Sequence, residues 1–144
     1  MNIRRWFYLL LFNMSLFLVY TLNAQTPVQV ASYIDSVGIL YPEIVFRQSI
    51  LESGWFKSPY YLKTKNLFGF RFKKSYIRFN KWQESVDYYK TWQLNHYTNM
   101  DEDYYQFLIR VRYASSNDYI KTLKRIRIKS YSYVFNKDIE HDSK

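Results

Sequence analysis

A helix bounded by a proline and a glycine constrains the fold more than any other stretch of this sequence. Pro42 suits the first helical position, Glu43 suits the positively polarised start, and Gly54 suits the residue just past the end. The positions from Ile44 to Leu51 are largely apolar. We therefore expect this short helix to be buried, with the rest of the chain packed around it.

Glu52 lies in the last turn of this expected helix, close to Trp55. The C-terminal end of a helix carries partial negative charge, and an apolar wall disfavours the ionised carboxylate. Both effects raise the pKa of the carboxyl group, which is what a general acid working near neutral pH requires. The alternative interpretation is a partly exposed glutamate that merely ends a helix.

The first 24 residues are typical of a secretory signal peptide. Two arginines precede an apolar run from Trp6 to Tyr20, and Ala24 ends a plausible cleavage site. The run is interrupted by Asn13 and is shorter than the roughly 20 apolar residues that span a bilayer. We expect an exported protein, either periplasmic or secreted, and an uncleaved N-terminal anchor is the alternative.

The remaining length suits a single domain over residues 25–135, followed by a polar tail over residues 136–144. The 144-residue chain contains no cysteine, which excludes disulfides, thiolate metal sites and a cysteine nucleophile. An exported domain without disulfides must be held together by its core.

The chain is strongly basic and rich in aromatic residues. Its formal charge of +9 favours anionic partners such as cell-wall glycopeptide, lipid head groups or nucleic acid. The 16 tyrosines offer flat faces that stack on sugars or bases, although most aromatics should fill the core. Since no nucleic-acid motif accompanies the expected export signal, we do not expect a nucleic-acid partner.

Apolar periodicity and turn residues predict a mainly α fold (α+β) with about five to six helices and a small β-hairpin. The hairpin is expected to have one buried and one basic face. The expected elements are helices over Val28–Tyr41, Lys81–Tyr97 and Asp118–Lys129, a helix opening at Asp101–Asp103, a brief helical turn within Lys57–Lys65, and strands Phe70–Phe72 and Tyr76–Phe79.

Other kinds of catalytic centre find no support in the sequence. His96 and His141 are far apart and lack ligand spacing, and no Ser-His-Asp set, zinc motif or glycine-rich phosphate loop stands out. We therefore expect neither a metal nor an organic cofactor.

Several short motifs occur in an order that resembles the glucosaminidase family of peptidoglycan hydrolases, the family 73 glycoside hydrolases, which share a lysozyme-like α fold. The resemblance covers roughly residues 28 to 128. The matching residues are Ile50-Leu51-Glu52-Ser53-Gly54-Trp55 with Lys57-Ser58, Asn66-Leu67-Phe68-Gly69, Phe79, Trp82, Glu84-Ser85-Val86, Tyr88, Tyr113-Ala114-Ser115 and Tyr119.

The resemblance implies cleavage of the β-1,4 bond on the reducing side of N-acetylglucosamine in peptidoglycan. Glu52 would be the general acid that protonates the leaving oxygen. Tyr113 would lie across the cleft and help to position the sugar or the developing charge. Asn66 and Phe68 would shape the floor of the site.

Trp55 is a further candidate for substrate binding, and Tyr119 would either stack on the sugar or only pack. The implied partner is the glycan strand of peptidoglycan, bound by a monomer. We expect membrane contact only if the N-terminal segment stays attached.

The sequence departs from the family pattern where a second acidic residue is common, after the Asn-Leu-Phe-Gly motif. The interval from Phe70 to Lys81 contains no aspartate or glutamate. The substrate's own N-acetyl group would then assist, or another acid such as Asp118 or one of Asp101–Asp103 would reach the cleft. The remaining alternatives are lytic transglycosylase or muramidase chemistry on the same fold, and a non-catalytic relative that still binds the wall.

Overall fold

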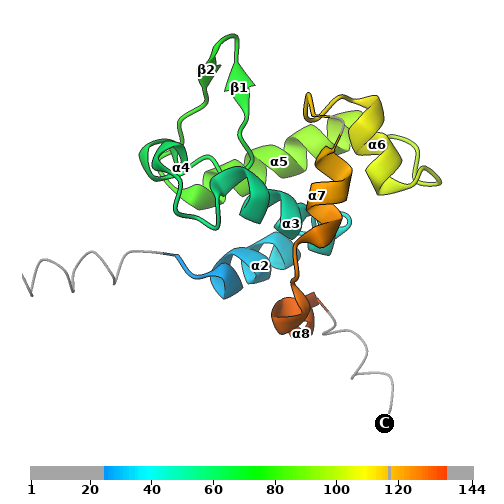
Figure 1. Cartoon of the computed structure of the whole chain (residues 1–144), viewed down its shortest axis with the longest axis horizontal. Helices are drawn as coiled ribbons and strands as arrows, with labels where there is room; N and C mark the ends of the chain where they lie inside the picture. The colour runs from blue at the N-terminus through cyan, green and yellow to red at the C-terminus, as the bar shows by residue number, and fades with distance from the viewer. Residues whose placement is uncertain (1–24, 117, 136–144) are drawn as a thin grey trace, which may run out of the picture.

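The computed structural model describes residues 25–116 and 118–135, so the expected signal peptide (1–24) and polar tail (136–144) lie outside the described residues. Within them the chain forms seven α-helices, one 3-10 turn and one two-stranded antiparallel sheet, which confirms the mainly helical fold (Figure 1). The elements are α2 (Pro27–Ser36), α3 (Pro42–Ser53), α4 (Pro59–Thr64), β1 (Arg71–Phe72), β2 (Ser75–Tyr76), α5 (Trp82–His96), α6 (Tyr104–Arg110), α7 (Tyr119–Arg125), the 3-10 turn Lys129–Tyr131 and α8 (Ser132–Phe135).

Helix α3 is the element around which the others pack, as its apolar sequence predicts. It contacts α2, α7 and α8, and Val45 and Phe46 are completely buried. Pro42 starts the helix, and Gly54 ends it in the left-handed conformation with φ 58°. The backbone N–H of Trp55 then donates to the carbonyl of Ile50 at 2.9 Å, which closes the last turn.

The predicted ends of the other helices agree with the structure where no glycine or irregular backbone intervenes. Helix α5 matches its prediction to within one residue at each end. Helix α2 ends at Ser36, short of the predicted Tyr41, because Gly38 and Tyr41 both take positive φ angles that a helix cannot contain. Helix α7 ends at Arg125 and is followed by the 3-10 turn.

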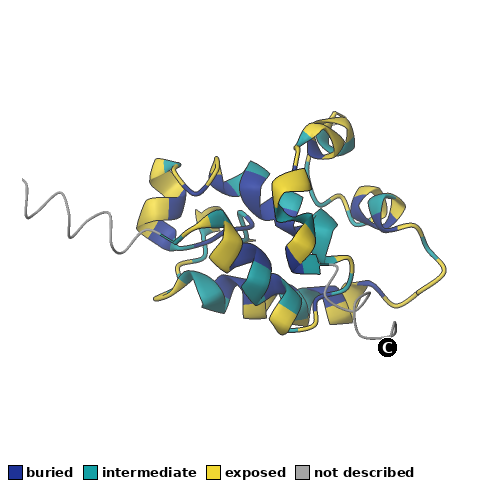
Figure 2. Cartoon of the chain, turned by 90° about the horizontal axis from the view of Figure 1, so that it is seen from below, coloured by how far each residue is buried: buried dark blue, intermediate teal, exposed yellow. Residues whose placement is uncertain are grey.

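The core lies between α2, α3 and α5 on one side and α6, α7 and α8 on the other. The buried positions of these helices are turned inward (Figure 2). Tyrosines and phenylalanines contribute many of its largest side chains. The largest fully buried aromatic side chains are Phe46, Tyr61, Tyr89, Tyr97, Tyr104 and Phe107. No helix in the described ranges is long and apolar enough to cross a bilayer.

The β-hairpin forms where the sequence predicts it, but its strands are shorter, the second being Ser75–Tyr76 in place of the predicted Tyr76–Phe79. The expectation of a buried face is also wrong. Each strand has two residues, and Arg71 pairs with Tyr76 while Phe72 pairs with Ser75. The hairpin projects beyond the helices in Figure 1, so none of the described elements covers it, and Phe72 is 71% exposed. Phe70, just before β1, is the aromatic that packs against the core.

Candidate active site

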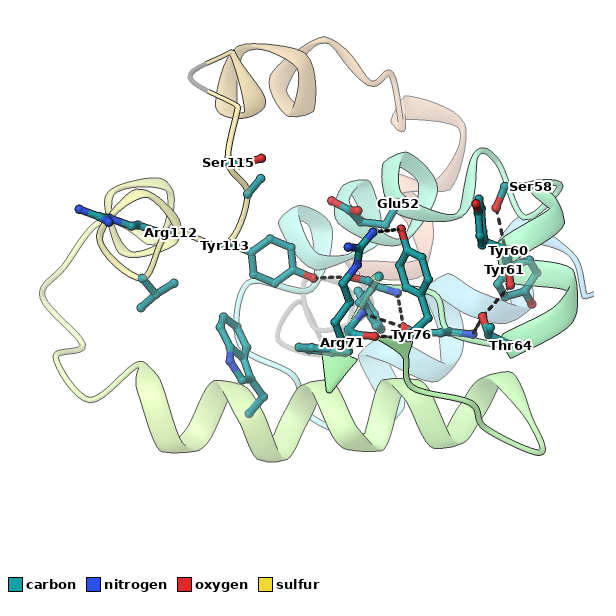
Figure 3. A pocket seen from close by; sticks show the side chains of 17 residues that line it. Glu52, Ser58, Tyr60, Tyr61, Thr64, Arg71, Tyr76, Arg112, Tyr113 and Ser115 are labelled. Atoms are coloured by element: carbon teal, nitrogen blue, oxygen red, sulfur yellow. Dashed lines mark hydrogen bonds between the residues drawn. The ribbon is translucent and has the colours of Figure 1, made fainter. Parts of the chain in front are cut away.

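A cavity of about 670 Å³ opens beside the C-terminal end of α3, and Glu52 is on its wall. The other walls come from α4, the hairpin and the segment that follows α6. Figure 3 shows Glu52, Arg71 and Tyr113 approaching this space from three different elements. The cavity therefore joins residues that are widely separated along the chain.

The pKa of Glu52 is raised above its ordinary value, as the sequence predicts for a general acid. Burial of the carboxyl group is the main cause, because a negative charge is poorly solvated there. A hydrogen-bonding contact with the hydroxyl of Tyr119 acts in the opposite direction and lowers the pKa. The balance favours a protonated carboxyl group at higher pH than for a free glutamate.

Gly69 makes room for the Glu52 carboxylate. A Cβ atom at this position would lie 3.0 Å from Glu52 Oε2, and the backbone φ is +68°, in the left-handed region that favours glycine. The sequence places Gly69 at a turn but gives no sign that the turn touches Glu52. That contact depends on how α4 and the following loop pack onto α3.

Asn66 holds the loop that carries Gly69. Its Nδ2 donates to the carbonyl oxygens of Phe70 at 2.8 Å and Ile77 at 3.1 Å. Its Oδ1 accepts from the backbone N–H groups of Phe68 at 3.3 Å and Phe70 at 3.1 Å. One buried amide thus joins the Asn-Leu-Phe-Gly turn to both arms of the hairpin, and its side chain lies at the wall of the cavity.

Tyr113 lies across the same cavity from Glu52, within the range over which the two groups influence each other electrostatically. Its hydroxyl donates to the carbonyl oxygen of Phe68 at 2.9 Å. Burial around this hydroxyl raises the pKa of Tyr113 well above its ordinary value, so the phenol is neutral. Since its one proton is bound to Phe68, the oxygen can accept a hydrogen bond from a substrate but cannot donate one.

The structure separates the three remaining candidates for substrate binding. Phe68 is 2% exposed, and its ring packs on Tyr89 with the centroids 4.4 Å apart, while the residue also lines the cavity. The hydroxyl of Tyr119 lowers the pKa of Glu52, and Tyr119 lines an adjoining cavity beside α6. Trp55 is 47% exposed and does not line the Glu52 cavity. Direct contact of any of the three with a sugar stays a prediction.

Glu52 is the one carboxylate among the described residues that line this cavity. Asp101, Asp103 and Asp118, the alternatives for a second acid, are not part of the lining. Asp103 instead caps α6, where its Oδ1 accepts two backbone N–H groups. Over residues 25–116 and 118–135, no cluster of three or more metal-ligating side chains is present.

Two positive charges, Arg71 and Arg112, also line the cavity. The guanidinium of Arg71 lies 4.2 Å from the ring centre of Tyr76, and its Nη2 donates to the Tyr76 hydroxyl at 2.6 Å. The site therefore combines one buried acid with a basic rim. Sequence reasoning recognised that the hairpin is basic but did not place Arg71 beside Glu52.

The comparisons with known proteins agree with this geometry. A family model described as Glucosaminidase (mannosyl-glycoprotein endo-beta-N-acetylglucosaminidase) matches residues 30–132, a range that includes Glu52, Asn66, Tyr113 and Tyr119. No match was found among curated proteins or among solved structures. Because the match covers more than half of the chain, the protein belongs to the glucosaminidase family.

Proposed function

We propose that this protein is an exported endo-β-N-acetylglucosaminidase that cleaves the β-1,4 bond after N-acetylglucosamine in peptidoglycan. Membership of the family implies a glycoside hydrolase that acts on peptidoglycan-like substrates. The observation that carries the finer proposal is Glu52, a buried carboxyl group of raised pKa on the wall of a cavity large enough for sugars. The expectation of export rests on the sequence of residues 1–24.

In the first step Glu52 donates its proton to the glycosidic oxygen as the bond from that oxygen to the anomeric carbon breaks. Positive charge develops on the sugar ring in an oxocarbenium-like transition state. Glu52 becomes a carboxylate, and the reducing-end fragment leaves with the proton as a new hydroxyl group. The raised pKa of Glu52 keeps the proton available at the pH at which this step occurs.

Since Glu52 is the one carboxylate that the described residues place on the wall, the second group in the reaction is proposed to come from the substrate. The carbonyl oxygen of the N-acetyl group attacks the anomeric carbon from the face opposite the leaving oxygen and forms a cyclic oxazolinium ion. Glu52, now ionised, takes a proton from a water molecule that opens this ring. Two displacements at one carbon retain the β configuration, as in other substrate-assisted glycosidases.

The basic rim favours a charged glycan over a neutral one. Arg71 and Arg112 place two positive charges at the cavity that holds Glu52. The peptide stems of peptidoglycan carry free carboxylates, which guanidinium groups bind well, whereas chitin carries no such charge. This supports peptidoglycan as the substrate class.

The test is digestion of purified peptidoglycan by the wild type and by Glu52→Gln, with the new reducing ends identified by mass spectrometry. The glutamine keeps the shape of the side chain but holds no transferable proton, so we expect release of fragments ending in N-acetylglucosamine to be abolished. Glu43→Gln changes the same charge at the other end of α3, away from the cavity, and should digest normally.

A non-catalytic role in binding the cell wall is a second candidate, favoured because the described part of the chain places no second carboxylate in the cavity lining. It predicts that the wild type and Glu52→Gln both sediment with insoluble peptidoglycan and that neither releases soluble product. Lytic transglycosylase or muramidase chemistry would instead give fragments ending in anhydro-N-acetylmuramic acid or in N-acetylmuramic acid.

A further inference from the structure

A chain of hydrogen-bonded side chains runs through the core from the backbone of Leu40 to the neighbourhood of Glu52. Four of its members are 0% or 1% exposed, so water does not compete for their hydrogen bonds. In the order of the hydrogen bonds, the side chains are Gln93, Tyr104, Tyr89, Gln48 and Tyr119, from helices α5, α6, α5, α3 and α7.

The orientation of the first amide is fixed by the backbone. The N–H of Leu40 donates to Gln93 Oε1 at 2.9 Å, and Gln93 Nε2 donates to the carbonyl of Leu40 at 2.9 Å. A flipped Gln93 amide would place its NH2 group against the Leu40 N–H, donor facing donor, and its oxygen against the Leu40 carbonyl, acceptor facing acceptor. The second proton on Gln93 Nε2 is therefore directed at the hydroxyl oxygen of Tyr104, 2.7 Å away.

The direction of every later hydrogen bond follows, because a tyrosine hydroxyl has only one proton. Tyr104 accepts from Gln93, so its own proton goes to the hydroxyl oxygen of Tyr89 at 2.8 Å. Tyr89 then donates to Gln48 Oε1 at 2.6 Å. The opposite direction would leave the proton of Tyr104 buried without an acceptor.

The same logic reaches Tyr119. Because Oε1 of Gln48 accepts from Tyr89, the Nε2 atom faces Tyr119 and donates to its hydroxyl oxygen at 3.3 Å. The proton of Tyr119 is not used by this bond. Glu52 lies one helical turn after Gln48 on the same face of α3, which brings its carboxyl group towards the Tyr119 hydroxyl, and the interaction with this hydroxyl lowers the Glu52 pKa.

We propose that this one-directional chain makes Tyr119 a hydrogen-bond donor to Glu52, so that Gln48, Tyr89, Tyr104 and Gln93 act as positioning residues for the acid. The donor stabilises the carboxylate that exists after Glu52 has given up its proton, and it opposes the effect of burial. Directed donors of this kind limit how far burial can raise the pKa, and they favour the proton-transfer step.

The other charged or titratable groups near Glu52 come from every element around the cavity, and the chain acts in addition to them. Those on the cavity wall are Tyr60 and Tyr61 from α4, Arg71 and Tyr76 from the hairpin, and Arg112 and Tyr113 from the segment after α6. The Tyr89 hydroxyl forms no hydrogen bond with any of them, because its two partners are Gln48 and Tyr104. A change at Tyr89 therefore tests the chain of hydrogen bonds separately from the groups on the cavity wall.

The experiment measures the titration of the Glu52 carboxyl by ¹³C NMR in the full chain, with the signal assigned by its loss in Glu52→Gln. Tyr89→Phe deletes the link between Tyr104 and Gln48, so the Gln48 amide can flip and compete for the Tyr119 proton. We expect the Glu52 titration midpoint to shift upward, in the same direction as in Tyr119→Phe and by no more. The basic limb of any pH–activity profile should shift with it.

Tyr97→Phe is the matched control. This hydroxyl is also buried, but it donates to the carbonyl of Glu102 and belongs to no step of the chain. We expect its Glu52 midpoint to equal that of the wild type. If Tyr89→Phe does not fold, Tyr89→Met removes the same hydroxyl with a side chain that adapts to the space, and it serves the same purpose.

An unchanged Glu52 midpoint in the chain-breaking variant would overturn the proposal, whether or not Tyr119→Phe shifts it. An equal shift in Tyr97→Phe would also overturn it, because the effect would then be general to buried tyrosines. The inference rests on Glu52 as the acid of the proposed function, but the NMR titration needs no turnover. A result that contradicts the role of the hydrogen-bond chain can therefore be distinguished from a result that contradicts the proposed enzymatic activity.

Discussion

At the scale of single residues, the proposed activity depends on a carboxyl group that is held where its charge is disfavoured. Burial raises the pKa of Glu52, so the folded state binds its proton more tightly than the unfolded state does. The stability of the fold must then fall as pH rises from the unfolded pKa towards the folded one, and it stays lower above that range. Function and stability are opposed at this position.

Glu52→Gln should therefore raise the melting temperature at neutral pH, because the glutamine has no charge to desolvate. At pH 3 and below, where the carboxyl is protonated in both states, the difference from the wild type should vanish. Thermal unfolding followed by circular dichroism at the two pH values measures this. If the variant melts at or below the wild-type temperature at pH 7, the carboxyl is not under the strain described.

Gly69 and Gly38 allow backbone strain to be separated from an effect on the site. Both have φ near +70°, but a Cβ at Gly38 meets nothing nearer than Lys90 Nζ at 4.0 Å, whereas one at Gly69 approaches Glu52 Oε2 at 3.0 Å. Each change to alanine should cost roughly 1–2 kcal/mol of stability from the left-handed conformation. Only Gly69→Ala should lose activity, and equal activities would show that the turn does not shape the acid.

At the scale of helices and strands, features set by a residue's own backbone could be predicted from the sequence, whereas features set by contacts between elements could not. The proline and glycine that bound α3 act through their own backbones, so the helix and the place of Glu52 could be predicted. The exposure of Phe72 could not be predicted, because alternation along a strand does not show whether anything covers it. Gln48 and Gln93 were also missed, because the partners that satisfy a buried amide lie on other helices.

The hairpin depends on Asn66, whose four hydrogen bonds should be worth several kcal/mol in total. Asn66→Ala should destabilise the fold by roughly 2–4 kcal/mol, because it leaves buried backbone groups without partners. Amide hydrogen exchange at Phe68 and Phe70 should become faster than at the α5 amides. Equal protection of both regions would show that another contact holds the loop.

Arg71 should let the hairpin distinguish glycan that carries peptide carboxylates from neutral glycan. We expect Arg71→Gln to weaken binding to peptide-bearing glycan by roughly 3- to 10-fold, as for loss of one partly exposed charge pair of about 1 kcal/mol, and to leave peptide-free glycan unaffected. Lys74→Gln removes the same charge from the same hairpin, outside the cavity lining, and should change neither. Equal losses in the two variants would indicate only nonspecific attraction.

At the scale of the whole molecule, a small helical domain brings together one acid from α3, a glycine turn, a tyrosine from the segment after α6 and a basic hairpin. The order of the motifs along the chain was enough to indicate the family and the mainly helical fold. The cavity itself could not be predicted, because its walls come from segments whose packing no local pattern encodes. Over residues 25–116 and 118–135, the cavity wall contains a single carboxylate, and this feature most limits its chemistry.

The most direct test of this account is the configuration of the first product, followed by ¹H NMR during digestion of a soluble peptidoglycan fragment. A single carboxylate assisted by the substrate's N-acetyl group should release the β-anomer first, which then equilibrates slowly with the α-anomer. Initial release of the α-anomer would contradict the account, because inversion requires a second carboxylate to activate water.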